Sequence, residues 1–230
     1  MKAMILSAGY GKRLLPLTSE CPKPLLKIGN GTLLSNTIKF LEKFGIEEIV
    51  INVHYLSNHI KNYINKNKFN LNIKIVEEKE KILDTGGGIL NAINHFSGKP
   101  FLVINPDTIW NSKYLKELQL MEKKFFENQE SKCLLLVVNK KKSFDQSFKG
   151  DFNLEKKIIN RKTENDLNYI YTGLQIIEPK IFSSFNEKVF SMNKIWDMLI
   201  KKEELNGIES NIDFLHVSNL NVYKNLLKKI

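Results

Sequence analysis

Two spacings of apolar residues alternate along this chain. Short apolar runs rich in β-branched residues have the character of buried strands, and between them lie segments with apolar residues every three or four positions, as in amphipathic helices. This alternation predicts a largely parallel sheet with helices on its faces. The predicted strands are residues 2–7, 48–53, 73–77, 101–105, 133–139, 169–177 and 213–217. The predicted helices are 33–44, 56–67, 87–95 and 112–126, two that follow Pro179 and Asn193, and a terminal helix from Asn219. A polar, hairpin-like stretch is expected at 150–160.

The composition is typical of a globular enzyme. The chain has 230 residues, of which 42% are hydrophobic and 26% charged, and this length is enough to enclose a core and a pocket. No apolar run approaches the roughly 20 residues that a membrane span needs. Met1 leads straight into the first predicted strand, so a signal peptide is not expected. These features predict a cytoplasmic protein with no membrane partner.

The cysteines argue against a zinc-binding or disulfide-bonded protein, and the distribution of charge argues against a nucleic-acid-binding protein. Cys21 and Cys133 are far apart and outside any zinc-binding spacing, so free thiols are expected. The formal net charge of +10 comes almost entirely from lysines, because Arg13 and Arg161 are the only arginines. Proteins that read nucleic acids usually rely on arginine for bidentate contacts. We therefore expect a solvated lysine-rich surface and no nucleic-acid partner.

The loop at residues 8–31 follows the first predicted strand and has unusual chemistry. Small residues at Ala8, Gly9 and Gly11 let backbone N–H groups approach an anion or a nucleobase closely. The dinucleotide-binding pattern would need a third glycine at Leu14, and the spacing of a Walker loop is absent. The loop therefore predicts a flat or anionic ligand held in a different way from either motif.

Two further signals lie after later predicted strands. Asp84 and Thr85 precede three glycines at the entrance of a helix, where exposed N–H groups can meet a ligand; the alternative is a flexible, glycine-rich helix start. Asp107 comes directly after the strand at 101–105. A carboxylate in that place can hold Mg²⁺ that bridges phosphates, although it can also act as a helix cap.

Together these motifs resemble the sugar-nucleotide pyrophosphorylases. Their signature, LxAGxGxRLxPLT followed by PKPLL, is matched at nearly every defining position: Gly9, Gly11, Arg13, Pro16, Thr18, Pro22, Lys23 and Pro24. The segment Asp84–Gly88 is similar to a Glu-Thr-Gly-Gly-Gly segment that borders the base in the N-acetylmuramate 1-phosphate uridylyltransferase branch. The resemblance implies a Rossmann-like, three-layer αβα sandwich with a mostly parallel mixed sheet, the GT-A-like nucleotidyltransferase fold. We expect a single domain, 1–230, with a nucleotide-binding half at about 1–110 and a sugar-phosphate-binding half at about 111–230.

The resemblance also implies roles for individual residues. The catalytic residues are Arg13 for the leaving phosphates, Lys23 for the transferring phosphoryl group and Asp107 for Mg²⁺. The expected nucleotide-binding residues are Leu6, Ala8, Gly9, Gly11, Lys12, Arg13, Lys23, Asp84 and Gly86. The expected sugar-phosphate-binding residues are Asn105, Gly150, Lys162, Thr172 and Gly173.

One position departs from the family pattern. Many relatives carry a second metal-binding Asp near the C-terminus, in a segment that corresponds here to residues 214–221, and His216 stands at the ligand position. Imidazole suits Mg²⁺ poorly and Mn²⁺ better. We therefore expect Asp107 to hold the metal, either alone or together with His216. The expected cofactor is Mg²⁺, with Mn²⁺ as the alternative.

The expected reaction transfers a nucleoside monophosphate to a sugar 1-phosphate, and the branch resemblance favours UTP and N-acetylmuramic acid 1-phosphate, hence peptidoglycan recycling. The expected partners are these small molecules alone. A mannose-1-phosphate guanylyltransferase, a cytidylyltransferase that acts on a small phosphorylated alcohol, and a catalytically silent nucleotide-binding homologue are the alternatives.

Overall fold

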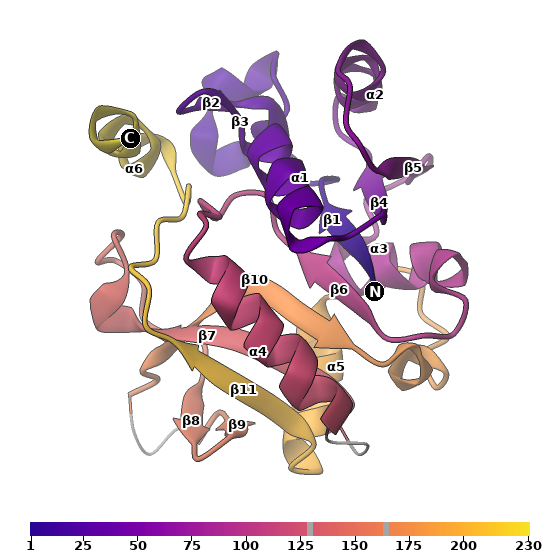
Figure 1. Ribbon diagram of the computed structural model, residues 1–230, viewed down its shortest axis with the longest axis vertical. Helices are drawn as coiled ribbons and strands as arrows, with labels where there is room; N and C mark the ends of the chain where they lie inside the picture. Colours follow the sequence, from indigo (N-terminus) through magenta and orange to yellow (C-terminus); the bar gives the residue numbers. More distant parts are fainter. Residues whose placement is uncertain (128–130, 163–165) are drawn as a thin grey trace.

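The computed structural model describes residues 1–127, 131–162 and 166–230. Within this part of the chain nine strands form one sheet in the order β5-β4-β1-β6-β10-β7-β11-β9-β8, and β2 and β3 pair separately (Figure 1). The strands are β1 (Lys2–Leu6), β2 (Lys27–Ile28), β3 (Gly31–Thr32), β4 (Glu48–Val53), β5 (Asn72–Glu77), β6 (Phe101–Ile104), β7 (Cys133–Asn139), β8 (Asn153–Glu155), β9 (Ile158–Asn160), β10 (Tyr169–Ile177) and β11 (Leu205–Ser210). The α-helices are α1 (Leu33–Phe44), α2 (Ser57–Lys66), α3 (Asp84–Ala92), α4 (Tyr114–Glu127), α5 (Met192–Lys201) and α6 (Leu220–Lys229).

The sheet is mixed and mostly parallel. β5, β4, β1 and β6 are parallel neighbours, as are β7 and β11, whereas β10 runs antiparallel between β6 and β7. The hairpin β8–β9 extends the sheet through an antiparallel contact with β11. This topology confirms the predicted α/β class, and the predicted hairpin-like stretch does form a hairpin.

Alternate side chains of the strands point into two separate cores, as the period of two in a strand requires. Ala3 and Ile5 pack in the cluster that also holds residues of α1, α2 and α4. Met4, between them, packs in the cluster that holds residues of α3 and α5. Helices therefore cover both faces of the sheet, and the three-layer prediction is confirmed.

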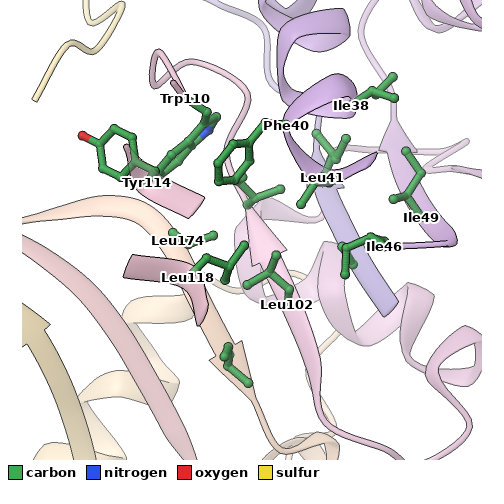
Figure 2. Packing of buried hydrophobic residues seen from close by; sticks show 14 of the residues in the cluster. Ile38, Phe40, Leu41, Ile46, Ile49, Leu102, Trp110, Tyr114, Leu118 and Leu174 are labelled. Atoms are coloured by element: carbon green, nitrogen blue, oxygen red, sulfur yellow. The ribbon is translucent and has the colours of Figure 1, made fainter. Parts of the chain in front are cut away.

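Aromatic packing joins α1 to α4 over one face of the sheet. Figure 2 shows Trp110 between the rings of Phe40 and Tyr114. The centroids of Phe40 and Trp110 are 5.8 Å apart, and those of Trp110 and Tyr114 are 5.0 Å apart. The indole N–H of Trp110 donates to the carbonyl of Asn105 over 2.8 Å, so this core also fixes the chain just after β6.

The α1 helix has signals for its start and its end in the sequence. The Thr32 hydroxyl accepts from the Ser35 N–H at 3.0 Å, and the Ser35 hydroxyl accepts from the Thr32 N–H at 2.8 Å, which is a capping box. Gly45 follows the last turn with φ of +96°, a conformation that glycine adopts without strain. These local signals explain why the predicted bounds of α1 are correct.

The predicted strand at 213–217 is wrong, and β11 takes its place in the sheet. The 213–217 segment makes only isolated bridges, Ser143 with Phe214 and Thr108 with His216. β11 reads Leu-Asn-Gly-Ile-Glu-Ser, which lacks a continuous apolar run. Gly207 lies in its middle because a Cβ there would come within 2.6 Å of the Ile159 side chain on β9. Tertiary contacts with β7 and β9 therefore select this strand over its weak local pattern.

The terminal helix α6 packs beside the loop that follows β1. Asn219 caps α6 by accepting from the Val222 N–H at 3.0 Å, as its place before the helix predicts. The Tyr223 hydroxyl donates to the Lys27 carbonyl over 2.6 Å, and Figure 1 shows α6 next to β2 and β3. The end of the chain thus supports the first loop. In the part of the chain that the structure describes, no helix is long and apolar enough to cross a membrane.

Candidate active site

A cavity of about 410 Å³ opens at the carboxyl ends of the parallel strands β1, β4 and β6. This is where open α/β sheets bind their ligands, and the volume lies within the range of small-molecule sites. The residues that line it are Leu6, Ser7, Ala8, Gly9, Gly11, Lys12, Arg13, Leu14, Lys23, Pro24, Leu33, Asn52, Ile82, Asp84, Thr85, Asn105, Pro106, Asp107 and Ser218. Except for Gly86, every predicted nucleotide-binding residue is among them.

Gly9 and Gly11 serve different purposes in the first loop. A Cβ at Gly9 would meet no protein atom within 4 Å, so a side chain is absent where the backbone faces open space in the cavity. Gly11 has φ of +65°, and a Cβ there would lie 3.0 Å from Thr18 Cγ2 and 3.2 Å from Lys23 Cβ. The buried Thr18 hydroxyl donates to the Gly11 carbonyl over 2.9 Å. Gly11 therefore shapes the loop, while Gly9 leaves its backbone accessible.

Lys23, Asp107 and His216 meet at the cavity. Lys23 Nζ lies 2.5 Å from Asp107 Oδ2, and His216 Nε2 lies 3.1 Å from the same oxygen. The three side chains are only 15%, 19% and 13% exposed, respectively. Burial alone would raise the pKa of the Asp107 carboxyl, but the charge of Lys23 and the contact with His216 hold this pKa well below its ordinary value. Asp107 is thus an ionised carboxylate.

Backbone hydrogen bonds place His216 beside Asp107. The Val217 N–H donates to the Asp107 carbonyl, and the Ile109 N–H donates to the Leu215 carbonyl, both over 2.8 Å. The imidazole stacks on the Phe214 ring, with centroids 5.4 Å apart. His216 therefore lies at the position where the family resemblance expects a second acidic ligand, although the segment around it is not a strand.

Asp107 has one oxygen available for a cation. Its Oδ1 atom is buried and has no hydrogen-bond partner among the described residues, as is also the case for His216 Nδ1. Three His, Cys, Asp or Glu side chains suitable for a metal are not found together in residues 1–127, 131–162 and 166–230. This arrangement offers a single carboxylate with an imidazole next to it, and it fits a cation that takes its other ligands from phosphates and water.

The glycines at the start of α3 are required by packing. A Cβ at Gly86 would overlap the Phe190 ring, and one at Gly87 would overlap the Lys188 carbonyl oxygen. Asp84 and Thr85, before them, line the cavity, and Asp84 has φ of +61°. The helix begins at Asp84, three residues before the predicted start, because these glycines permit close packing inside the helix. Gly86 is buried behind the residues that face the cavity.

The predicted sugar-phosphate residues divide into two groups. Asn105 lines the cavity, and its N–H donates to the Gly173 carbonyl over 2.8 Å. Gly173 has φ of +89° in a bulge of β10, and a Cβ there would lie 2.8 Å from Asn105 Cβ. The neighbouring Thr172 hydroxyl is buried and donates to the Leu136 carbonyl over 2.8 Å. The structure thus brings Thr172 and Gly173 next to Asn105, and of these three residues Asn105 lines the cavity.

Gly150 and Lys162 form the second group. Gly150 has φ of +90°, and a Cβ there would overlap the Leu167 carbonyl oxygen, so its backbone packing requires glycine. The Lys162 side chain is 64% exposed, and its Nζ lies 3.2 Å from Glu155 Oε2. Neither residue lines the cavity. Their roles toward the sugar phosphate rest on the family resemblance.

The sequence motifs did not identify several residues that line the cavity. Ser7, Asn52, Thr85 and Ser218 line the cavity without having been selected. Asn52 lies near the carboxyl end of β4, so the criterion that selected Asp107 after β6 could have found it. Arg161, which the sequence singled out only as one of two arginines, does not line the cavity; its guanidinium lies 4.6 Å from the Phe152 ring centroid and pairs with Asp197.

Comparison with known proteins agrees with this geometry. A family model described as "Nucleotidyl transferase" matches residues 2–148. An N-acetylmuramate alpha-1-phosphate uridylyltransferase of Neisseria meningitidis serogroup B is 34% identical over 79% of this chain and 77% of its own. The N-acetylmuramate alpha-1-phosphate uridylyltransferase of Caulobacter vibrioides is 26% identical over 94% of this chain and 90% of its own. The crystal structure of HddC from Yersinia pseudotuberculosis shares the fold, with a TM-score of 0.78 at 23% identity over 99% of this chain and 98% of that one.

The chain therefore belongs to the nucleotidyl transferase family. The resemblance to the sugar-nucleotide pyrophosphorylases is confirmed, and the protein is an enzyme of the sugar-1-phosphate nucleotidyltransferase class.

Proposed function

We propose that this enzyme transfers UMP from UTP to N-acetylmuramic acid 1-phosphate in the cytoplasm, releasing pyrophosphate, as a step of peptidoglycan recycling. The observation that carries the proposal is the contact of Lys23 with Asp107 in a cavity formed by the first loop and the end of β6. The two uridylyltransferase relatives support the choice of substrates, because both match along most of this chain and most of their own.

The reaction needs positioning and charge neutralisation. A phosphate oxygen of the sugar 1-phosphate attacks the α-phosphorus of UTP in line, the bond to the β-phosphate oxygen breaks, and pyrophosphate leaves with the electron pair. Negative charge gathers on the transferring phosphoryl group and on the leaving group, so fixed cations and N–H donors lower the barrier. Lys23 stabilises the transferring phosphoryl group. Its contact with Asp107 limits the positions of the ammonium group in advance.

The leaving phosphates are bound by the first loop. Arg13 and Lys12 are exposed side chains at the wall of the cavity, free to turn toward an anion. Guanidinium forms bidentate contacts with phosphate, and the backbone N–H groups at Ala8 and Gly9 add donors beside it. The nucleoside then contacts Leu6, Ala8, Gly9, Asp84 and Thr85, and Gly86 supports this segment through its packing against Phe190.

Asp107 is the residue that would hold Mg²⁺, through the oxygen that no described group occupies. Bound there, the cation would neutralise negative charge on the substrate phosphates. His216 adds an imidazole next to this carboxylate, and imidazole is a better ligand for Mn²⁺ than for Mg²⁺. The residues present would therefore accept Mn²⁺ as well as Mg²⁺.

The sugar 1-phosphate lies toward β10. Asn105 lines the cavity on that side with the Thr172–Gly173 bulge packed behind it, and in the family pattern Lys162 and Gly150 complete the subsite. No nucleic acid takes part in this reaction, and the substrates are free small molecules.

The proposal is tested by measuring pyrophosphate release with Mg²⁺ or Mn²⁺. UTP, GTP, CTP and dTTP are each combined with a panel of acceptors that includes N-acetylmuramic acid 1-phosphate, mannose 1-phosphate and a small phosphorylated alcohol. Release with UTP and N-acetylmuramic acid 1-phosphate alone is the expected result. Release with GTP and mannose 1-phosphate would make the enzyme a guanylyltransferase, and release with CTP and a phosphorylated alcohol would make it a cytidylyltransferase.

A catalytically silent homologue is the second candidate, and His216 is the observation that favours it. Replacement of the second acidic ligand would remove metal activation and leave the nucleotide pocket intact. Thermal stabilisation by nucleotide without pyrophosphate release across the panel would identify that case.

A further inference from the structure

A chain of buried hydrogen bonds links the first loop to the start of α3. The Ser7 N–H donates to Asn52 Oδ1 over 2.9 Å, and Asn52 Nδ2 donates to Glu78 Oε1 over 2.7 Å. The Leu83 N–H then donates to Glu78 Oε2 over 2.8 Å. Ser7, Asn52 and Glu78 are only 2%, 3% and 3% exposed. Both oxygens of one buried carboxylate are thereby used to connect two segments.

The burial of Glu78 at this place costs free energy. Among the described residues, no Lys, Arg or His side chain forms an ion pair with it, so N–H donors alone compensate its burial. A carboxylate that is removed from water costs several kcal/mol unless it is paired or well hydrogen-bonded. An apolar side chain would serve packing at lower cost. The carboxylate therefore has a purpose that depends on the hydrogen bonds themselves.

The packing around the pair keeps it in place. A Cβ at Gly88 would lie 2.8 Å from both Asn52 Nδ2 and Glu78 Oε1, so α3 approaches the two side chains as closely as glycine allows. The third glycine of the Asp84–Gly88 segment is thus explained by the contact with Glu78.

One end of this hydrogen-bonded chain lines the cavity, and the other end directly precedes residues that line it. Ser7 and Asn52 line it from the side of β1 and β4, and Asp84 and Thr85, which follow Leu83, line it from the side of α3. Leu83 is the residue before the helix, and Asp84 has the left-handed φ of +61°. Holding the Leu83 N–H fixes the point from which Asp84 enters the cavity wall.

We infer that Glu78 is a positioning residue, which holds the Asp84–Thr85 segment at a set distance from the first loop so that nucleoside and phosphates are bound at once. The inference rests on the proposed function, because the ligand is the nucleotide. A segment held in advance loses less entropy on binding. Breaking the chain of hydrogen bonds therefore weakens nucleotide binding and leaves turnover at saturation largely unchanged.

The test compares Glu78→Gln with Glu77→Gln. Glutamine at 78 keeps the shape but has one N–H₂ group, which faces a donor whichever way the amides of residues 52 and 78 are turned. Glu77 is the adjacent residue on β5, and its carboxylate faces outward to Ser57 and Lys61, at 2.5 and 2.8 Å. The Kd for UTP is measured by titration calorimetry, KM and kcat by pyrophosphate release, and folding by thermal melting.

Glu78→Gln is expected to raise the Kd and KM for UTP about tenfold, the effect of losing one charge-assisted hydrogen bond, with kcat changed less than about threefold. The ratio of Kd values for GTP and UTP falls toward unity, because the base is held less firmly. Glu77→Gln leaves all three values unchanged. Unaltered Kd and KM in Glu78→Gln, or a loss confined to kcat, would overturn the inference.

Two further outcomes separate this inference from the proposed function. If Glu78→Gln does not fold, Asn52→Ala breaks the chain at its other joint and must raise the Kd for UTP in the same way. If the unaltered protein binds UTP but releases no pyrophosphate with any acceptor, the proposed reaction is wrong, and the comparison of Kd values still decides the role of Glu78. If it binds no nucleotide, both are wrong.

Discussion

The ammonium group of Lys23 and the carboxylate of Asp107 lie 2.5 Å apart, although 84 positions separate the two residues in the chain. Lys23 begins the one-turn helix η3 (Lys23–Leu25), between Pro22 and Pro24, and Asp107 follows β6. Because both side chains are largely buried, this ion pair is screened less by water than a surface pair. It joins the first loop to the end of β6 and places a cation and a carboxylate on one wall of the cavity.

Replacement of Lys23 by alanine is expected to lower kcat by about a hundredfold or more, because a cation that stabilises the transferring phosphoryl group is worth on the order of 3 kcal/mol in the transition state. Steady-state pyrophosphate release measures the effect, and circular dichroism reports whether the fold is intact. Lys27→Ala, an exposed lysine nearby, is the control. Near-normal turnover of a folded Lys23→Ala variant would remove Lys23 from the mechanism.

Replacement of His216 by aspartate is expected to change the choice of metal. A second carboxylate next to Asp107 suits Mg²⁺, whereas imidazole suits Mn²⁺. The ratio of kcat with Mg²⁺ to kcat with Mn²⁺ should therefore rise in His216→Asp, and a chelator should abolish the activity of both proteins. His59→Asp, at an exposed position of α2, should leave the ratio unchanged. An equal ratio in all three proteins would show that His216 does not influence the metal.

Gly9→Ala is expected to weaken nucleotide binding, whereas Gly11→Ala is expected to lower the stability of the fold. Because a Cβ at Gly9 meets no protein atom, Gly9→Ala should change the free energy of unfolding by less than about 0.5 kcal/mol, yet raise the Kd for UTP about tenfold by blocking close approach. Gly11→Ala should lower the free energy of unfolding by about 1 kcal/mol or more, since φ is +65° and Thr18 is close. Chemical denaturation and calorimetric titration of both variants measure these values. A normal Kd in Gly9→Ala would contradict the assigned approach of the nucleotide.

Lys162 provides a test of the sugar-phosphate subsite. Its ion pair with Glu155 is exposed, so Lys162→Ala should leave the melting temperature almost unchanged. If Lys162 holds the sugar phosphate, the KM for the sugar 1-phosphate rises about tenfold while the KM for UTP stays the same. Lys157→Ala, in the same hairpin region, is the control. Identical KM values in both variants would show that Lys162 does not bind the sugar phosphate. The neighbouring Arg161 would then be the next residue to test.

The two thiols are expected to differ in reactivity. Both cysteines are free, and Cys133 is fully buried in β7 while Cys21 is half-buried. Burial raises the pKa of the Cys133 thiol and also that of Cys21, which lowers the thiolate fraction at neutral pH. A disulfide reagent at pH 8 should therefore modify Cys133 only after unfolding, and Cys21 slowly before it. Mass spectrometry identifies the modified residue, and rapid modification of Cys133 in the native protein would contradict this burial.

Local sequence patterns were sufficient to predict most elements and many of the residues that line the cavity. The bounds of α1, β4, β7 and β10 were predicted correctly, because strong local apolar periods and caps define them. The first-loop residues and Asp107 were found because small residues and a carboxylate directly after buried strands lie at the edge where parallel strands end. Local chemistry and this one topological rule were sufficient for that half of the site.

The contacts between distant segments, in contrast, depend on tertiary packing. β11 became a strand because β7 and β9 pair with it, while the more apolar 213–217 segment turned His216 toward Asp107 instead. The same packing gave Gly86, Gly87 and Gly88 their roles against Phe190, Lys188 and the Asn52–Glu78 pair. A sequence pattern reports what one segment prefers, whereas these contacts depend on which partners the fold brings within a few ångströms.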